Sequence, residues 1–186
     1  MVGYSAEGSI TMLTLALLRH AKSNWEVEGA LDFERDLAPR GLEAAARMGA
    51  EIARTGFSPD LVLCSSAVRA RMTYDLAAPF IGPAPRNVQY EDRLYMAGAR
   101  QLLDRIHDIP DAVRSVMFVG HNPGFHELNI ALIGDCAPEA ERATKSKFPT
   151  CAFAVYTFDM DRWADVAPRK GRVIHFATPR RLSEGD

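Results

Sequence analysis

The sequence predicts an α/β fold, a single-domain three-layer sandwich in which helices cover both faces of a mostly parallel central sheet. Short apolar segments alternate with longer segments of helical periodicity, which is typical of strands joined by crossover helices. The apolar segments are nearly continuous in apolar residues, as strands buried on both faces require. The 186 residues are enough for one domain with a sizeable core.

Strands are expected in segments that are short, apolar and rich in aliphatic or aromatic side chains. These segments are Leu13–Leu18, Leu61–Ser65, Val116–Gly120, Cys151–Phe158 and Val173–Ala177. In a mostly parallel sheet the carboxyl ends of the strands form one edge, and ligands bind outside that edge. Residues that directly follow these segments are therefore the first candidates for function.

Helices are expected between the strands, at Pro39–Thr55, Ala67–Ala78, Ala99–His107 and Phe125–Ile133. The first has a proline in its first turn and Gly56 just beyond its end, which is the usual asymmetry of helix termini. Ala38 gives it no side-chain cap unless Asp36 reaches the first turn. Either Ser65 or Ser66 is expected to cap the second helix.

Two segments are expected outside these elements. Residues 1–11 are polar and patternless, so we expect a disordered leader followed by a folded domain over 12–186. Met12 immediately precedes the first strand and is an alternative native start to Met1. Gly134–Phe148 has a loop-like composition and is predicted to be a solvated surface loop rather than a mobile flap.

Composition argues against several classes of protein. The formal net charge is −2 with no polybasic run, which argues against binding to nucleic acid or to a membrane surface. No apolar stretch reaches the ~18 residues of a membrane span, and the N-terminus lacks the order of a signal peptide. Cys64, Cys136 and Cys151 fit neither a disulfide framework nor a zinc site, so a reducing, cytoplasmic location is expected.

Arginine and histidine side chains follow three of the predicted strands at one sheet edge. Arg19 and His20 end the first strand, and Ser23 adds a donor on the loop beyond them. Arg69 follows the second strand near the start of a helix, where free N–H groups favour anions, and His121 follows the third. Because guanidinium groups bind phosphate through paired donors, the sequence predicts a site for a phosphoryl group.

Neighbouring residues refine this site. Arg71 lies two residues beyond Arg69, and a helix turns about 200° over two residues, so only one of the two arginines can enter the site. Asn122 adds a donor in the tight turn that follows His121. The other histidines, His107, His126 and His175, are expected on the surface or in structural roles.

The three segments together resemble a known family. The patterns LxRHAxS, SxxxRAxxT and VGHNPG resemble the histidine phosphatase superfamily, and Arg-His-Ala in place of Arg-His-Gly is similar to its SixA-like phosphohistidine phosphatase group. The resemblance extends from Leu13 to Pro179 and includes DFERDLAPRG at Asp32–Gly41, Leu94-Tyr95 and Phe148-Pro149-Thr150. It implies a phosphoglycerate mutase-like fold.

The resemblance also implies roles. His20 would be the nucleophile that takes the phosphoryl group, and Arg19, Arg69 and His121 would bind the phosphoryl oxygens. A nucleophilic imidazole must be neutral, and the two arginines would lower its pKa by repelling the imidazolium form. The implied activity is a phosphatase with a phosphohistidine intermediate that needs neither a metal nor another cofactor. Its partner would be a phosphorylated protein or a small phosphate, and the sequence implies no oligomeric state.

The proton donor is less well defined by the sequence. Asp92 lies where mutase-like members carry a glutamate, and Glu91 is the neighbour that would serve instead, but an exposed acidic pair is the simpler interpretation. Asn122 stands where phytase-like members carry an acid. A phosphoramidate depends less on such an acid, because its imidazole leaving group can already carry a proton. This favours phosphohistidine on a signalling protein as the substrate.

Other enzyme classes fit less well. Cys136 and Arg142 match the Cys-x5-Arg loop of cysteine phosphatases, but Glu139 and Glu141 between them would repel phosphate. A phosphoglycerate-type mutase is disfavoured by Arg-His-Ala and by Glu26, where mutases tend to carry asparagine.

Two further alternatives stay open. One is a small-molecule phosphomonoesterase of the same superfamily. The other is a non-catalytic phosphoprotein-binding or signalling module, although the presence of His20, Arg69 and His121 favours catalysis.

Overall fold

One six-stranded sheet forms the centre of the computed structural model, which describes residues 12–25, 29, 31–82, 87–134 and 146–184. The strand order is β3-β2-β4-β1-β5-β6. Strands β1 to β4 run parallel to one another, whereas β5 is antiparallel to both β1 and β6. The bounds are β1 Leu13–Arg19, β2 Leu61–Ser65, β3 Asn87–Glu91, β4 Ser115–Gly120, β5 Phe153–Phe158 and β6 Arg172–Ala177.

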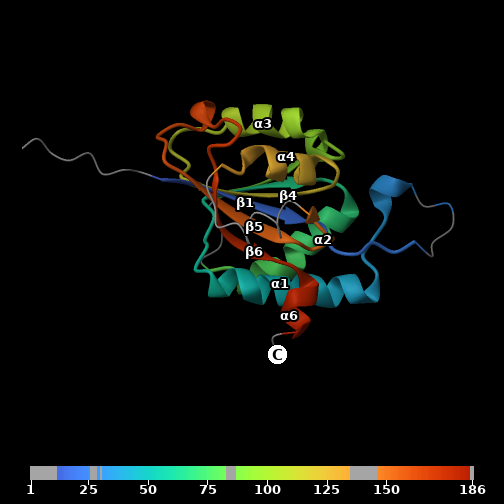
Figure 1. Cartoon of the computed structure of the whole chain (residues 1–186). Helices are drawn as coiled ribbons and strands as arrows, with labels where there is room; N and C mark the ends of the chain where they lie inside the picture. The colour runs from blue at the N-terminus through green and yellow to red at the C-terminus, as the bar shows by residue number, and fades with distance from the viewer. Residues whose placement is uncertain (1–11, 26–28, 30, 83–86, 135–145, 185–186) are drawn as a thin grey trace, which may run out of the picture.

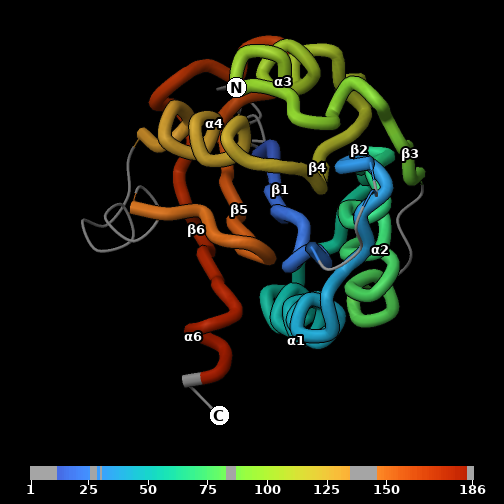
Figure 2. The backbone as a smooth tube through the Cα atoms, turned by 90° about the vertical axis from the view of Figure 1, so that its right-hand side faces the viewer, coloured from blue at the N-terminus to red at the C-terminus, as the bar shows by residue number. Residues whose placement is uncertain are grey.

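Helices cover both faces of this sheet, as Figures 1 and 2 show. The helices α1 (Pro39–Arg54), α2 (Val68–Ala77) and α6 (Pro179–Glu184) contribute to the core on one face. The helices α3 (Ala99–His107) and α4 (Gly124–Leu132) contribute to the core on the other face. The predicted α/β three-layer sandwich is confirmed. Short 3-10 helices lie at Asp32–Glu34, Ala78–Phe80, Asp92–Leu94 and Trp163–Asp165.

The central strand β1 shows why the sheet is buried on both sides. Successive side chains of a strand point to opposite faces, so Leu15 and Leu17 join the core beneath α3 and α4. Ala16 and Leu18 join the core beneath α1 and α2. All four side chains have an exposed fraction of 0%. This burial places the polar end of β1 at a fixed point on the sheet edge.

Two elements do not follow the apolar pattern and were not predicted. β3 is an edge strand of sequence NVQYE, none of whose residues is fully buried. Its polar composition is permitted because only one side of an edge strand pairs within the sheet. α6 has six residues, which is too short for helical periodicity to be recognised.

The predicted side-chain cap of α2 is absent, whereas α1 lacks a side-chain cap, as Ala38 indicated. The N-cap of α2 is Ala67, and no side-chain hydrogen bond caps it. Ser66 instead donates its hydroxyl to Asp92 on the loop after β3. Asp36 makes no capping bond to α1, which begins at Pro39 with no side-chain cap.

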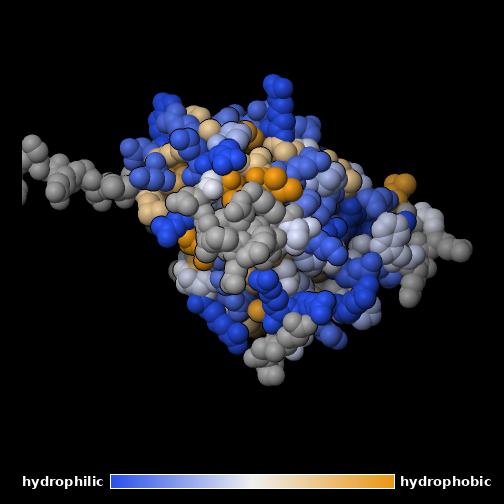
Figure 3. Space-filling view, viewed as in Figure 1, coloured by the Kyte–Doolittle hydropathy of each residue, from blue (hydrophilic) through white to orange (hydrophobic). Residues whose placement is uncertain are grey.

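Some sequence predictions fall outside the described residues. These are the leader over residues 1–11, Glu26, the Cys136 segment and most of the loop Gly134–Phe148. Within the part that is described, no helix is both long enough and apolar enough to cross a membrane. The face shown in Figure 3 is mainly hydrophilic, with small groups of hydrophobic residues.

Candidate active site

The parallel pairing of β1 with β4 brings two of the predicted residues together. Arg19 is in register with Gly120, so His20 and His121 leave the sheet side by side. Their ring centroids are 5.0 Å apart, with an angle of 50° between the ring planes. The backbone N–H of His20 donates to the carbonyl of Gly120 at 2.9 Å, and Cys151 donates to the carbonyl of His20 at 3.0 Å. The position of His20 is therefore fixed from both neighbouring strands.

The hydrogen bond of the His20 ring defines its tautomer. Nδ1 lies 2.7 Å from the carbonyl oxygen of Ala21. A carbonyl only accepts hydrogen bonds, so Nδ1 carries the proton and Nε2 of the neutral ring carries the lone pair. Burial lowers the pKa of His20 to about 4, the Ala21 bond opposes this shift, and the charges of Arg69 and Arg19 add to it. The two arginines therefore lower the pKa of His20 as expected, but burial lowers it more.

The loop after His20 is held against two helices. The N–H of Ala21 donates to the Thr73 hydroxyl at 2.9 Å, and that hydroxyl donates to the carbonyl of Arg69 at 2.6 Å. Thr73 thus links the segments that carry His20 and Arg69. At Gly41 on α1, an added Cβ would lie 2.2 Å from the carbonyl oxygen of Lys22, so only glycine allows this approach.

Arg69 is buried and is bound by an acidic residue that the sequence did not single out. One Nη donates to the backbone carbonyl of Asp32, and the other donates to Oδ2 of the same residue at 2.9 Å. The Tyr95 hydroxyl donates to the same Oδ2 at 2.6 Å. These hydrogen bonds, first from Tyr95 and then from Arg69, hold the pKa of Asp32 below its ordinary value although burial opposes them. Arg71 is exposed, so Arg69 is the arginine that enters the site.

Arg19 lies close enough to Arg69 for the two charges to interact. Burial lowers the pKa of Arg19, and the charge of Arg69 lowers it further. One Nη of Arg19 donates to the carbonyl of Phe148 at 2.9 Å, and Nδ2 of Asn122 donates to the same carbonyl at 2.9 Å. Among the residues that the structure describes, the buried Nε of Arg19 has no hydrogen-bond partner. Two neighbouring cations with an unused buried donor favour binding of an anion.

His121 completes this group from the end of β4. Its Nε2 lies 2.8 Å from the Ser65 hydroxyl, and its ring packs edge-on against Tyr95 at a centroid distance of 5.4 Å. Its buried Nδ1 has no hydrogen-bond partner within the described part of the chain. Burial lowers the pKa of His121 to about 3, and the neighbouring His20 and Arg69 contribute to this shift. The ring is therefore neutral and offers one free nitrogen.

The carboxylates proposed as proton donors are engaged elsewhere. Glu91 accepts bidentate hydrogen bonds from Arg105, at 2.8 to 3.1 Å, and a further hydrogen bond of 2.7 Å from Arg93. Burial raises the pKa of Glu91, but the two arginines together bring it below its ordinary value. An ionised carboxylate of this kind is unsuited to donate a proton, so these contacts argue against Glu91 as the acid. Asp92 is exposed and accepts from Ser66.

Within the described part of the chain, no side-chain hydrogen bond links Ser23 to the other residues of this group. It is 6% exposed, and its backbone forms an isolated bridge with Leu37. This bridge fixes the loop beyond His20, and the role of the Ser23 hydroxyl as a phosphate donor stays a prediction.

The sequence missed four side chains that support the site: Asp32, Ser65, Thr73 and Tyr95. Each contacts His20, Arg69 or His121, or the backbone next to one of them. Asp32 is 37 residues from Arg69 in the chain, so no local pattern connects them. Asp32 and Tyr95 fall inside segments that match the family pattern, and this match was the signal in the sequence that could have identified them.

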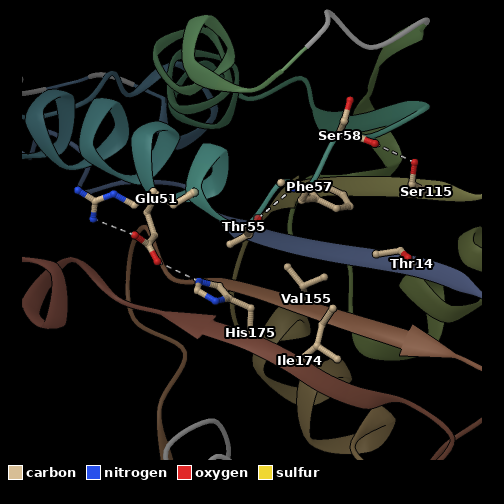
Figure 4. Close-up of a pocket in the computed structure, with 11 residues that line it drawn as sticks. Thr14, Glu51, Thr55, Phe57, Ser58, Ser115, Val155, Ile174 and His175 are labelled. Atoms are coloured by element: carbon tan, nitrogen blue, oxygen red, sulfur yellow. Dashed lines mark hydrogen bonds and ion pairs between the residues drawn. The ribbon is translucent and has the colours of Figure 1, made fainter.

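A separate cavity lies at the opposite sheet edge. It has a volume of about 500 Å³, and its lining includes Thr14 and Ser115 at the amino ends of β1 and β4. Figure 4 shows Glu51 and His175 at its wall, where Nε2 and Oε1 are 3.3 Å apart. None of the three sequence motifs contributes a phosphate-site residue to it. No group of metal-ligating side chains is found among the described residues.

Sequence comparisons place the chain in a family. The model of the histidine phosphatase superfamily (branch 1) matches residues 15–95. An uncharacterised protein of Mycobacterium tuberculosis is 38% identical over 166 residues, which are 88% of this chain and 100% of the relative. A 2,3-bisphosphoglycerate-dependent phosphoglycerate mutase of Thermobifida fusca is 38% identical over 92 residues, which are 46% of this chain and 37% of the mutase.

Solved structures share the fold across nearly the whole chain. One described as the phosphohistidine phosphatase SixA of Agrobacterium tumefaciens is 32% identical, covers 90% of this chain and 98% of its own, and has a TM-score of 0.75. Another, described as SixA of Nakamurella multipartitia, is 28% identical, with 90% and 96% covered and a TM-score of 0.75. The three-layer sandwich is thus the phosphoglycerate mutase-like fold of SixA structures, and the chain belongs to the histidine phosphatase superfamily.

Proposed function

We propose that the protein is a phosphatase that forms a phosphohistidine intermediate on His20, and that its substrate is phosphohistidine on another protein. The observation that carries the proposal is the tautomer of His20. Its Nδ1 proton is committed to the carbonyl of Ala21, which leaves the Nε2 lone pair as the nucleophile. The ring is neutral at pH values above about 4, so no separate base is needed to activate it.

The reaction has two steps. In the first, Nε2 of His20 forms a bond to phosphorus, and the bond from phosphorus to the substrate nitrogen breaks with its electron pair going to the leaving imidazole. In the second, water attacks phosphorus, the P–N bond to His20 breaks, and Nε2 regains its lone pair while the water proton passes to solvent. Arg19, Arg69 and Nδ1 of His121 would bind the phosphoryl oxygens in both transition states.

The charges that surround the site support a mechanism without a metal. Phosphoryl transfer requires mainly positioning and charge stabilisation, and the buried Arg69 together with the partly buried Arg19 can supply both. Loss of one arginine would lower kcat by roughly 10²–10³, by analogy with other oxyanion contacts. Activity is expected to survive prolonged dialysis against EDTA. Loss of activity in EDTA with recovery on addition of Mg²⁺ would contradict this part of the proposal.

Phosphohistidine fits the site better than a phosphate ester does. An alkoxide needs a proton as it leaves, but Glu91 is held ionised by two arginines and Asp32 is held ionised by Tyr95 and Arg69. An imidazole that already carries a proton leaves as a neutral molecule without an acid. Two structures described as SixA phosphohistidine phosphatases are 32% and 28% identical to this chain, which supports the same substrate. Such a substrate would suit a signalling role in the cytoplasm.

A small-molecule phosphomonoesterase is the second candidate. The match to a phosphoglycerate mutase over 92 residues favours it, as does the exposed carboxylate of Asp92 beside the start of α2. In this case Asp92 would donate the proton to the leaving alkoxide. The substitution Asp92→Asn would then abolish ester hydrolysis and leave phosphohistidine hydrolysis intact.

The proposal is tested by comparing the wild type with His20→Ala on a phosphohistidine protein and on a panel of small phosphates. We expect the variant to be inactive on all of them and the wild type to show acid-labile phosphate on His20 after rapid quenching. His126→Ala, on α4, is the matched control and should retain both properties. Activity of His20→Ala near the wild-type level would exclude the proposed nucleophile, and faster cleavage of alkyl phosphates than of phosphohistidine would exclude the proposed substrate.

A further inference from the structure

We infer that Asp32 is a specificity-determining residue, whose carboxylate makes the site select phosphoryl compounds that carry a positive charge on the leaving group. The inference deepens the proposed phosphatase function and rests on it, because it names the charge class of the substrate. Protonated phosphohistidine has such a leaving group, whereas phosphorylated carboxylic acids and bisphosphates carry the opposite charge.

The position of Asp32 at the phosphate site follows from its partners. Its Oδ2 accepts from Arg69 at 2.9 Å and from the Tyr95 hydroxyl at 2.6 Å, and Arg69 also donates to its backbone carbonyl. Tyr95 in turn packs edge-on against the His121 ring. The carboxylate therefore contacts Arg69 directly and is separated from His121 by one residue, Tyr95.

Exposure determines which charge an incoming substrate meets here. The Asp32 side chain is 47% exposed, while Arg69 is 5% exposed and Arg35, the other arginine near the carboxylate, is 18% exposed. Arg35 has its Nε 3.6 Å from Oδ1, and its guanidinium lies over the Trp25 ring, 4.3 Å from the ring centroid. Both arginine side chains are less exposed than the carboxylate that they contact, so its negative charge is the one most accessible to an incoming substrate.

The charge of Asp32 also moderates the attraction of the site for free anions. His20 and His121 are neutral, so the described charges next to the phosphoryl position are those of Arg19, Arg69 and Asp32. A substrate with a cationic leaving group is attracted by all three charges. The two arginines attract its phosphoryl group, and Asp32 attracts its leaving group. A second anionic group on the substrate would be repelled by the carboxylate that covers Arg69.

The test uses two size-matched, non-hydrolysable probes, 2-aminoethylphosphonate and 3-phosphonopropionate. They share a phosphonate and two methylenes and differ in the charge at the far end. By calorimetry we expect the wild type to bind the aminoethyl compound about tenfold more tightly, which is the size expected for a unit charge across a few ångströms of partly wet space. Asp32→Asn should bring the two dissociation constants within about twofold of each other.

The matched control is Asp36→Asn, which removes the same charge from an exposed residue on the same loop. It should keep the wild-type preference. The wild-type preference should also shrink as salt is raised from 0.05 to 0.5 M, because a partly exposed charge is screened, and this measurement needs no variant.

Each outcome bears on the inference separately from the phosphatase proposal, since binding of the probes requires no turnover. An equal affinity of the wild type for both probes, or an unchanged preference in Asp32→Asn, overturns the role of Asp32. An equal loss of preference in Asp36→Asn overturns it as well, because the effect would then come from overall charge. Failure to form phospho-His20 would instead refute the phosphatase while leaving the charge preference measurable.

Discussion

The Ser65 hydroxyl lies between the N–H of Ala67, 3.4 Å away, and Nε2 of His121, 2.8 Å away. The backbone N–H can only donate, so Ser65 accepts from Ala67, and its own hydroxyl proton is available for donation to Nε2. We therefore expect the His121 proton on Nδ1, the nitrogen without a partner among the described residues. The loop that starts α2 thus orients a donor that would reach a phosphoryl oxygen.

Replacement of Ser65 tests this orientation. In Ser65→Ala the His121 ring loses the bond that selects its tautomer, so we expect kcat to fall roughly fivefold, in line with loss of about 1 kcal/mol. Ser65→Thr retains the hydroxyl and serves as the control. Nitrogen NMR shifts of His121 report the tautomer directly, and an unchanged tautomer in Ser65→Ala would contradict the assignment.

Folding stability should depend on pH through the two buried histidines. Burial lowers the pKa of His20 from 6.5 to about 4, so below pH 6.5 the unfolded chain binds a proton that the folded chain does not. The free energy of unfolding therefore falls as pH decreases from 6.5 to about 4, and it is fully recovered above pH 6.5. With about 1.4 kcal/mol per pKa unit, the loss amounts to a few kcal/mol.

Urea unfolding at pH 7.0 and 5.0 measures this dependence. His20→Asn should have a smaller difference in unfolding free energy between the two pH values than the wild type. His107→Asn removes a histidine whose Nε2 is hydrogen-bonded to Val166 outside the site, and it should keep the wild-type difference. Equal differences in all three proteins would show that His20 is not buried in its neutral form.

Thr73 should connect the positions of His20 and Arg69. Thr73→Val removes both the acceptor for Ala21 and the donor to Arg69, which we expect to cost about 1–3 kcal/mol of stability because both backbone groups are buried. The looser loop should lower kcat more than it raises KM. Thr73→Ser keeps the hydroxyl and is expected to restore kcat. A normal kcat in Thr73→Val would show that the loop is held by its other contacts.

Glu91 should contribute to stability and not to proton donation. Glu91→Gln leaves the buried guanidinium of Arg105 without its counter-charge, so we expect the unfolding free energy to fall by roughly 2 kcal/mol. The pH–rate profile, measured well below the melting temperature, should keep the same acidic and basic limbs. Disappearance of one limb would restore Glu91 as the acid.

The fold and the centre of the site were predictable because they depend on local patterns. Buried strands such as Leu13–Arg19 are apolar along their length, and the residues that end them fall at one edge of the sheet. The edge strand Asn87–Glu91 lacks this signal because it is partly exposed. Asp32 could not be assigned, since its contact with Arg69 depends on how the loop after β1 folds back over α2.

The predicted proton donors, Glu91 and Asp92, also have surroundings that the sequence does not reveal. Glu91 and Asp92 are adjacent in the chain, but Glu91 lies within reach of Arg105 on α3, while Asp92 reaches Ser66. The direction of each side chain at the end of a strand follows from its neighbours in space. The sequence therefore identified the pair and not its two different environments.

The carbonyl of Phe148 accepts from both Arg19 and Asn122, and the Phe148 ring is packed against Phe125 and Phe176. Phe148 thus acts as an anchor at the boundary between the active site and the segment that precedes it in the chain. The segment between Gly134 and Lys147 can be replaced by the corresponding segment of a relative, with Phe148 kept, to build chimeric proteins. In such chimeras the phosphate-binding groups should stay in register, so that any change in substrate preference can be attributed to the exchanged segment.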